Sequence, residues 1–142
     1  MNLMPSSPES EVLHQRLNEI TSGNMLLQVT ASALERVGGQ VWRLKTGRAA
    51  LVSVLGVLRY RKETGQDPNN LSEVVAAGCL DAVPTDPYSG GPLVYRRTDG
   101  GFLLYSVGEN RRDDGGVLGT DSGGQPKMWS DNGDWVFWPV TD

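Results

Sequence analysis

The feature that most constrains the fold is a change in the period of apolar residues near residue 82. Before this point apolar residues recur every three or four positions, which is typical of amphipathic helices. After it, short alternating runs are separated by Gly, Pro and Asp, which is typical of antiparallel strands and their turns. Helices followed by strands predict an α+β fold. We expect a long helix packed on a small antiparallel sheet of three or four strands, with additional N-terminal helices.

The helical half divides at glycines. Residues 10–20 and 25–37 each carry an apolar stripe, and Gly38 and Gly39 are expected to break or kink the helix that precedes them. The strongest helix is expected over residues 41–64. Its buried face is predicted from its largest apolar residues, among them Leu51, Leu55 and Leu58.

A short helix is expected to follow the long one. Asn70 is its predicted N-cap, and Glu73 is the expected partner in a capping box. The predicted buried side consists of Leu71, Val74, Val75 and Leu80.

The strand half is expected to contain a hairpin and a closing strand. Residues 93–97 and 102–107 form the hairpin around a turn at 98–101, and residues 135–138 form the last strand. The strand residues Leu93, Tyr95, Leu103 and Tyr105, or their alternates, are expected to pack on the long helix. We therefore divide the chain into a helical segment, residues 1–46, and an α+β head domain, residues 47–142.

Composition excludes several classes of function. The net charge of −4 argues against a nucleic-acid-binding surface, which is normally basic. A single Cys, Cys79, and a single His, His14, exclude disulfide frameworks and His-cluster metal sites. No pair of nucleophile and base is visible, so we expect no enzyme activity. Cys79 is expected to be a small buried side chain rather than a reactive thiol.

Membrane and targeting signals are also missing from the sequence. The most apolar run, residues 49–58, is half as long as the roughly 20 residues that a membrane-spanning helix needs. The first ten residues lack the basic and apolar regions of a secretory signal peptide. We expect no membrane span in this chain.

Residues 47–138 resemble the soluble part of the major pseudopilin of type II secretion systems. The resemblance rests on turn, strand and helix residues in the family's order: Tyr60, Arg61, Gly65, Pro68, Leu71, Pro84, Asp86, Pro87, Gly90, Pro92, Tyr95, Tyr105, Ser106, Gly108, Asp134 and Trp135. It implies the family's head domain alone, since we identify neither the basic leader nor the apolar anchor of that family among these residues. It further implies a non-enzymatic role in assembly or in contacts with other proteins, located at the cell envelope or outside the cytoplasm.

The resemblance also implies a calcium site in the Gly- and Asp-rich loop before the last strand. Calcium prefers six to eight oxygen ligands from carboxylates, carbonyls and water. The expected ligands are Asp113, Asp114, Asp131 and Asp134, and Asp121 lies in the same loop. Asn110 stands where the family has an aspartate, so it offers a neutral oxygen. The alternative is a plain solvated acidic loop without metal.

A second functional hypothesis is a glycan- or peptide-binding module. Trp129, Trp135 and Trp138 could supply an aromatic platform if they are exposed. Packing of Trp135 or Trp138 in the core is the competing interpretation of the same residues.

Overall fold

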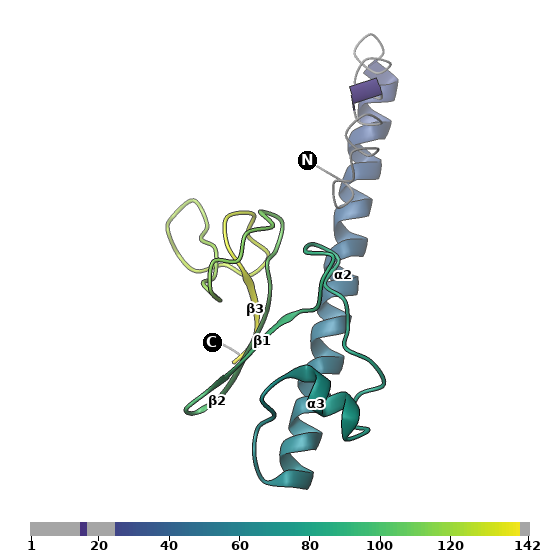
Figure 1. Ribbon diagram of the computed structural model, residues 1–142. Coiled ribbons are helices and arrows are strands. Elements are labelled where there is room, and N and C mark those ends of the chain that lie inside the picture. Colours follow the sequence, from purple (N-terminus) through teal and green to yellow (C-terminus); the bar gives the residue numbers. More distant parts are fainter. Residues whose placement is uncertain (1–14, 17–24, 140–142) are drawn as a thin grey trace. The chain divides into compact units, whose positions relative to one another are not determined.

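The computed structural model describes residues 15–16 and 25–139 (Figure 1). Helix α2, Met25–Thr64, is followed by α3, Leu71–Ala76. Three strands come next: β1, Val94–Thr98, β2, Gly101–Ser106, and β3, Trp135–Trp138. The chain forms two compact units, Met1–Leu44 and Lys45–Asp142. The second unit confirms the expected α+β fold, with the long helix packed on a three-stranded antiparallel sheet.

The predicted break at Gly38 and Gly39 is wrong, because α2 runs without interruption through both glycines. A glycine inside a helix costs only about 1 kcal/mol relative to alanine. Because helix propagation is cooperative, good helix formers on both sides of the glycines offset this cost and the helix continues. The helix expected over residues 10–20 lies outside the described residues except for Gln15 and Arg16, which are helical.

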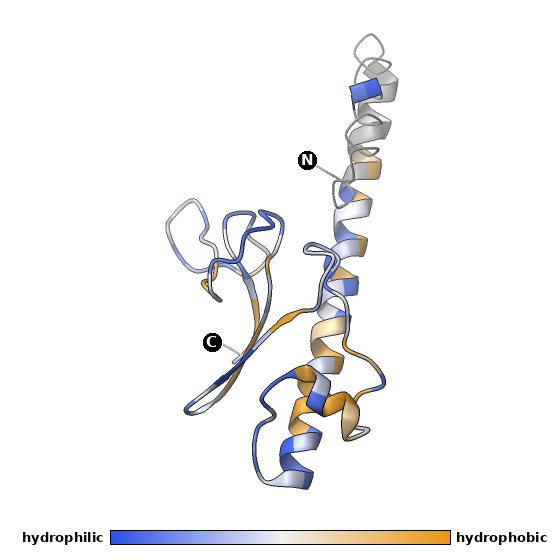
Figure 2. Ribbon diagram, viewed as in Figure 1, coloured by the Kyte–Doolittle hydropathy of each residue, from blue (hydrophilic) through white to orange (hydrophobic). Residues whose placement is uncertain are grey.

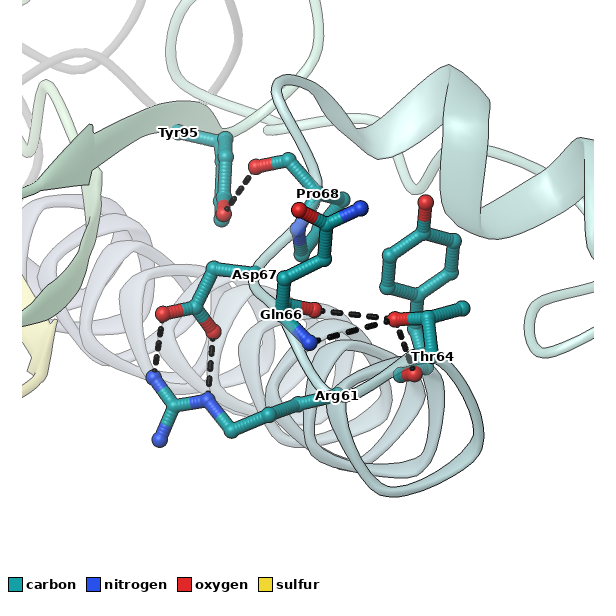
Figure 3. A network of polar contacts seen from close by, with 7 residues as sticks. Arg61, Thr64, Gln66, Asp67, Pro68 and Tyr95 are labelled. Carbon is teal, nitrogen blue, oxygen red and sulfur yellow. Dashed lines mark hydrogen bonds and ion pairs between the residues drawn. The ribbon is translucent and has the colours of Figure 1, made fainter.

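The end of α2 is tied to the sheet by a polar network (Figure 3). Gly65 has a positive φ of 77° and donates its N–H to the Arg61 carbonyl, which ends the helix. Arg61 then binds both carboxylate oxygens of Asp67 through Nε and Nη2, at 2.5 and 2.6 Å. The Tyr95 hydroxyl donates to the carbonyl of Pro68 at 2.7 Å. The turn after α2 is thereby anchored to strand β1.

The predicted cap of α3 is confirmed. The Asn70 side chain accepts a hydrogen bond from the Glu73 N–H at 3.1 Å. The Glu73 carboxylate accepts from the backbone N–H of Asn69, one residue before the cap. Leu71 and Val74 of α3 are buried, as their spacing predicts.

The sheet has the order β1-β2-β3, and both pairs of neighbours are antiparallel. Thr98 pairs with Gly101, so β1 and β2 are joined by a two-residue turn at Asp99 and Gly100. The register shifts between β2 and β3, where Phe137 is the extra residue between Val136 and Trp138. A bulge of this kind turns two successive side chains toward one face, and Phe137 and Trp138 both pack against the core.

The hydrophobic core lies between the helices and one face of the sheet. Figure 2 shows apolar residues gathered on α3, on the segment after it and on the C-terminal part of α2. The buried members include Ala50, Val57, Leu71, Val74, Leu80, Leu93, Phe102 and Leu104. The second unit therefore has one continuous core, built from both of its helices and the hairpin.

The predicted core face of α2 is wrong for its two central leucines. Leu51 and Leu55 are 60% and 57% exposed, whereas Val54 and Leu58, which belong to the same predicted face, pack against the core. The helix instead turns small side chains inward, Ala50 and Ser53, together with Val57. Small residues let the neighbouring segment come close: a Cβ on Gly56 would lie 3.1 Å from the Cys79 carbonyl. The buried side of α2 thus faces the segment around Cys79 at close range, and Leu51 and Leu55 lie on the side turned away from it.

We predict that Leu104→Ala lowers the free energy of unfolding by about 2–5 kcal/mol, because Leu104 is fully buried. The matched control is Leu55→Ala, the same chemical change at an exposed position, and it should cost less than about 0.5 kcal/mol. Urea denaturation of both variants measures the difference. Equal losses for the two variants would contradict the assigned core face.

Candidate functional site

The Gly- and Asp-rich segment between β2 and β3 covers the face of the sheet that the helices leave open. Phe102 and Leu104 point into the helix-facing core, so the alternating residues Leu103 and Tyr105 point to the other face. Gly116 packs directly against them, because a Cβ at this residue would lie 2.6 Å from Leu103 Cδ2 and 3.4 Å from the Tyr105 ring. We call residues 108–134 the covering loop.

Asp113 fastens the start of the covering loop to β1 and β2. Its Oδ1 accepts hydrogen bonds from the Tyr105 hydroxyl at 2.7 Å and from the Gly115 N–H at 2.9 Å. Its Oδ2 lies 3.5 Å from Nη2 of Arg96. The Tyr105 hydrogen bond, followed by the Gly115 N–H, lowers the pKa of Asp113. Burial, together with the Asp113 carboxylate, raises the pKa of Tyr105.

Asp134 is the one predicted ligand that is fully buried. Its Oδ2 accepts a hydrogen bond from the Gly116 N–H at 2.7 Å, whereas its Oδ1 is buried without a hydrogen-bond partner. Burial raises the pKa of Asp134, and the nearby carboxylates of Asp113 and Asp114 raise it further, against the lowering effect of the backbone N–H groups of Gly116 and Asp114. An unpartnered buried carboxylate oxygen is costly, and it can be satisfied by a proton or a cation.

The other loop carboxylates are engaged elsewhere or exposed. Asp114 accepts from the Asn110 amide at 2.8 Å and lies 3.3 Å from Nε of Arg112. Asp121 accepts from the backbone N–H groups of Gly123 and Gln125, which lower its pKa. Asp131 is exposed. Within residues 15–16 and 25–139, no three acidic, His or Cys side chains form a group suited to a metal.

Asn132 organises the far end of the covering loop, and sequence analysis did not single it out. Its Oδ1 accepts from the Thr120 N–H at 2.9 Å and from the Ser130 hydroxyl at 2.6 Å. The Ser130 carbonyl in turn accepts from the Trp135 indole at 2.7 Å. Asn132 therefore joins two parts of the covering loop, because Thr120 lies 12 residues before it in the sequence.

Asp86 is a second buried carboxylate, and sequence analysis named it only among the residues behind the family resemblance. Its Oδ2 accepts from the Ser106 hydroxyl at 2.9 Å and its Oδ1 from the Tyr88 N–H at 3.1 Å. The Ser106 hydroxyl oxygen also accepts from the Gly108 N–H at 3.1 Å. These hydrogen bonds join the turn before β1 to the end of β2. The role of Asp86 is therefore structural.

The three tryptophans of the strand half are used for packing. Trp135 is fully buried, with its ring against Tyr88 at 4.6 Å and Trp129 at 4.7 Å between centroids. The Trp138 ring stacks on Phe102 at 5.3 Å. The interpretation of Trp135 as a core residue is therefore confirmed, and its buried ring is not available to an exposed binding platform.

Cys79 is buried, as predicted. Its sulfur lies 3.3 Å from Oε2 of Glu63. Burial, followed by the contact with Glu63, raises the pKa of the thiol. His14 lies outside the described residues.

No family model, no curated protein and no solved structure matches this chain. The helices of the described residues contain no stretch with the length and apolar character that crossing a membrane requires.

We predict that a thiol reagent labels Cys79 of the native protein at neutral pH at least about tenfold more slowly than the urea-unfolded chain. The reason is that burial and the Glu63 carboxylate both disfavour the reactive thiolate. Labelling followed by mass spectrometry measures both rates. Equal rates would show that the thiol is accessible and would reopen a redox role.

Proposed function

We propose that this chain is a non-enzymatic, pseudopilin-like head domain that acts in assembly or in protein contacts at the cell envelope. The observation that carries the proposal is the order of its parts. A long helix precedes an antiparallel hairpin, and a Gly- and Asp-rich loop covers the hairpin before a short closing strand. The sequence resemblance implies this same order.

The motif residues behind the resemblance hold these parts together. Asp86 and Ser106 link the first turn to β2, and Asp134 links the covering loop to β3. Gly108 has a positive φ of 65°, and a Cβ there would lie 2.8 Å from the Gly133 carbonyl. Only glycine fits this crossing without strain. The resemblance therefore coincides with contacts that the fold needs, which supports a shared head-domain architecture.

The proposed role predicts an effect on protein export by the cells that make this protein. Deleting the gene in its source cells should reduce the set of exported proteins, and the full-length protein should restore it. Membrane fractionation should recover the tagged protein with the cell envelope. When a photoreactive residue replaces the exposed Val117, the protein should be cross-linked to proteins with pilin-type apolar anchors. An unchanged exported set, together with recovery among cytoplasmic enzymes, would contradict the proposal.

We further propose that the covering loop binds one structural Ca²⁺. The buried Oδ1 of Asp134 fits this ion, because it is an acceptor that the protein leaves unsatisfied. The other oxygen ligands would come from Asp113 or Asp114, from Asp131 and from backbone carbonyls of the loop. Asp113 and Asp114 would exchange their present partners, Tyr105 and Asn110, for the ion. When bound, the ion would neutralise the carboxylates gathered at Asp134.

Calcium should therefore stabilise the folded protein. Binding to the folded state alone adds about 2.7 kcal/mol at a hundredfold excess over Kd. The melting temperature of metal-free protein should rise with millimolar Ca²⁺ and fall again with chelator. Asp134→Asn should abolish this response, whereas Asp121→Asn, at the exposed tip, should retain it. An identical melting curve with and without Ca²⁺ would contradict the proposed calcium site and favour the alternative, a solvated loop without metal.

The pH dependence in chelator provides an independent check. Because the folded pKa of Asp134 is raised, the folded state holds its proton to a higher pH than the unfolded chain does. This group therefore favours folding at low pH, and that contribution is lost as the pH rises through the folded pKa. In chelator at pH 7, Asp134→Asn should raise the melting temperature. A lower melting temperature for the variant would contradict the buried, unpartnered carboxylate.

A further inference from the structure

The middle of the covering loop, residues 112–128, contributes no buried side chain to the core. All of these residues are described, and only Gly119, which has no side chain, is buried. Val117, an apolar residue of this segment, is 63% exposed. A segment with few buried apolar contacts opens at a lower free energy than the core beside it. We call residues 112–128 the lid.

The backbone is strained immediately before and after the lid. Among the residues that the structure describes, Arg111 and Trp129 are the two non-glycine residues with a positive φ, at 56° and 65°. This conformation costs free energy for an L-residue, and for a bulky one such as tryptophan it is a genuine outlier. Strained positions of this kind are typical of switch regions. Here they mark a hinge at each end of the lid.

Both hinge residues are held by the part of the head that lies outside the lid. The Arg111 N–H donates to the Gly108 carbonyl at 3.3 Å. The Trp129 ring lies against the rings of Trp135 and Phe137 in β3, at 4.7 and 5.7 Å between centroids. The lid is therefore suspended between two anchored residues.

Polar contacts hold the lid closed. Three hydrogen bonds cross between it and the residues just before β3: Gly116 N–H to Asp134 Oδ2 at 2.7 Å, Thr120 N–H to Asn132 Oδ1 at 2.9 Å, and Asp134 N–H to the Val117 carbonyl at 2.9 Å. At the start of the lid, Asp113 accepts from the Tyr105 hydroxyl at 2.7 Å. Lifting the lid breaks all of these bonds together.

Other hydrogen bonds lie within the lid and keep it together. The Lys127 N–H donates to the Gly119 carbonyl at 2.8 Å, and the Asp121 N–H donates to the Gln125 carbonyl at 2.9 Å. These bonds join the two arms of the lid to each other and not to the sheet. They can persist when the lid moves, so the geometry favours one concerted opening over fraying residue by residue.

We propose that the lid lifts from the sheet as one unit, turning about Arg111 and Trp129, while the helices and strands stay folded. Asp134 is fully buried, and two of the three crossing hydrogen bonds end on it. Its carboxylate therefore meets solvent only when the lid is open, and the lid controls the access of water and cations to it. The opening itself depends neither on the head-domain role nor on a bound calcium ion.

Amide hydrogen exchange of the full chain in chelator, followed by NMR, tests the proposal. The amides of Gly116, Thr120 and Asp134 should have protection factors equal within about threefold, because one opening exposes all three. They should exchange at least about tenfold faster, after correction for intrinsic rates, than the paired amides of β1 and β2, which need global unfolding. Chelator keeps the outcome separate from the calcium proposal.

Two variants distinguish lid opening from global unfolding. Tyr105→Phe removes the hydroxyl that binds Asp113 and keeps the ring, so the protection factors of the lid should fall by about three- to tenfold. Val74→Ala shortens a fully buried side chain of α3 and leaves every contact of the lid in place. It should lower the protection of the strand amides and leave that of the lid amides unchanged.

Three results would overturn the proposal. Lid amides as well protected as the strand amides would show that the loop opens only when the whole head unfolds. Protection factors that differ by more than about tenfold among the three lid amides would show piecemeal fraying. Unchanged lid protection in Tyr105→Phe would show that Asp113 does not hold the lid. The wild-type protein alone decides the first two outcomes, whether or not a variant folds.

Discussion

The second unit is governed by one constraint: its three-stranded sheet carries apolar side chains on both faces, and each face needs a cover. Phe102 and Leu104 are covered by helices, whereas Leu103 and Tyr105 are covered by a loop without regular structure. A loop is a poor cover, because its backbone polar groups must find partners of their own. Asp113, Asn132 and Asp134 supply those partners, so the acidic side chains of this region are first of all structural.

The sequence was sufficient for the order and type of elements in the second unit. The strands, the hairpin and the Asn70 cap depend on local chemistry, namely alternation, Asp-Gly and an Asx side chain, which the sequence shows directly. The turn itself was predicted as four residues, 98–101, but Thr98 and Gly101 pair, so only Asp99 and Gly100 form it. The helix face was not predictable in the same way. Large apolar residues such as Leu55 dominate a pattern of hydrophobicity, whereas the buried side of the helix carries the small Ala50 and Ser53. On the same helix, a Cβ at Gly56 would lie 3.1 Å from the Cys79 carbonyl.

The candidate site was predicted only in part. Asp134 was one of four ligands that the family resemblance implied, and its unpartnered buried oxygen is the feature that needs explaining. The pairing of Asp113 with Tyr105 was not foreseen, because the two residues meet only through the path of the covering loop. The sequence shows where the carboxylates lie along the chain, but it does not show which of them accept hydrogen bonds from other parts of the folded protein.

The crossing at Gly108 and Gly133 brings the two ends of the covering loop into contact, while its tip around Asp121 and Gly123 is exposed and held by its own turn. A segment whose ends are fixed and whose tip is independent tolerates added length, because the entropy of closing a loop grows slowly with the number of residues. The tip is therefore a natural place to graft a foreign epitope or a reporter peptide. The head would then serve as a small display scaffold.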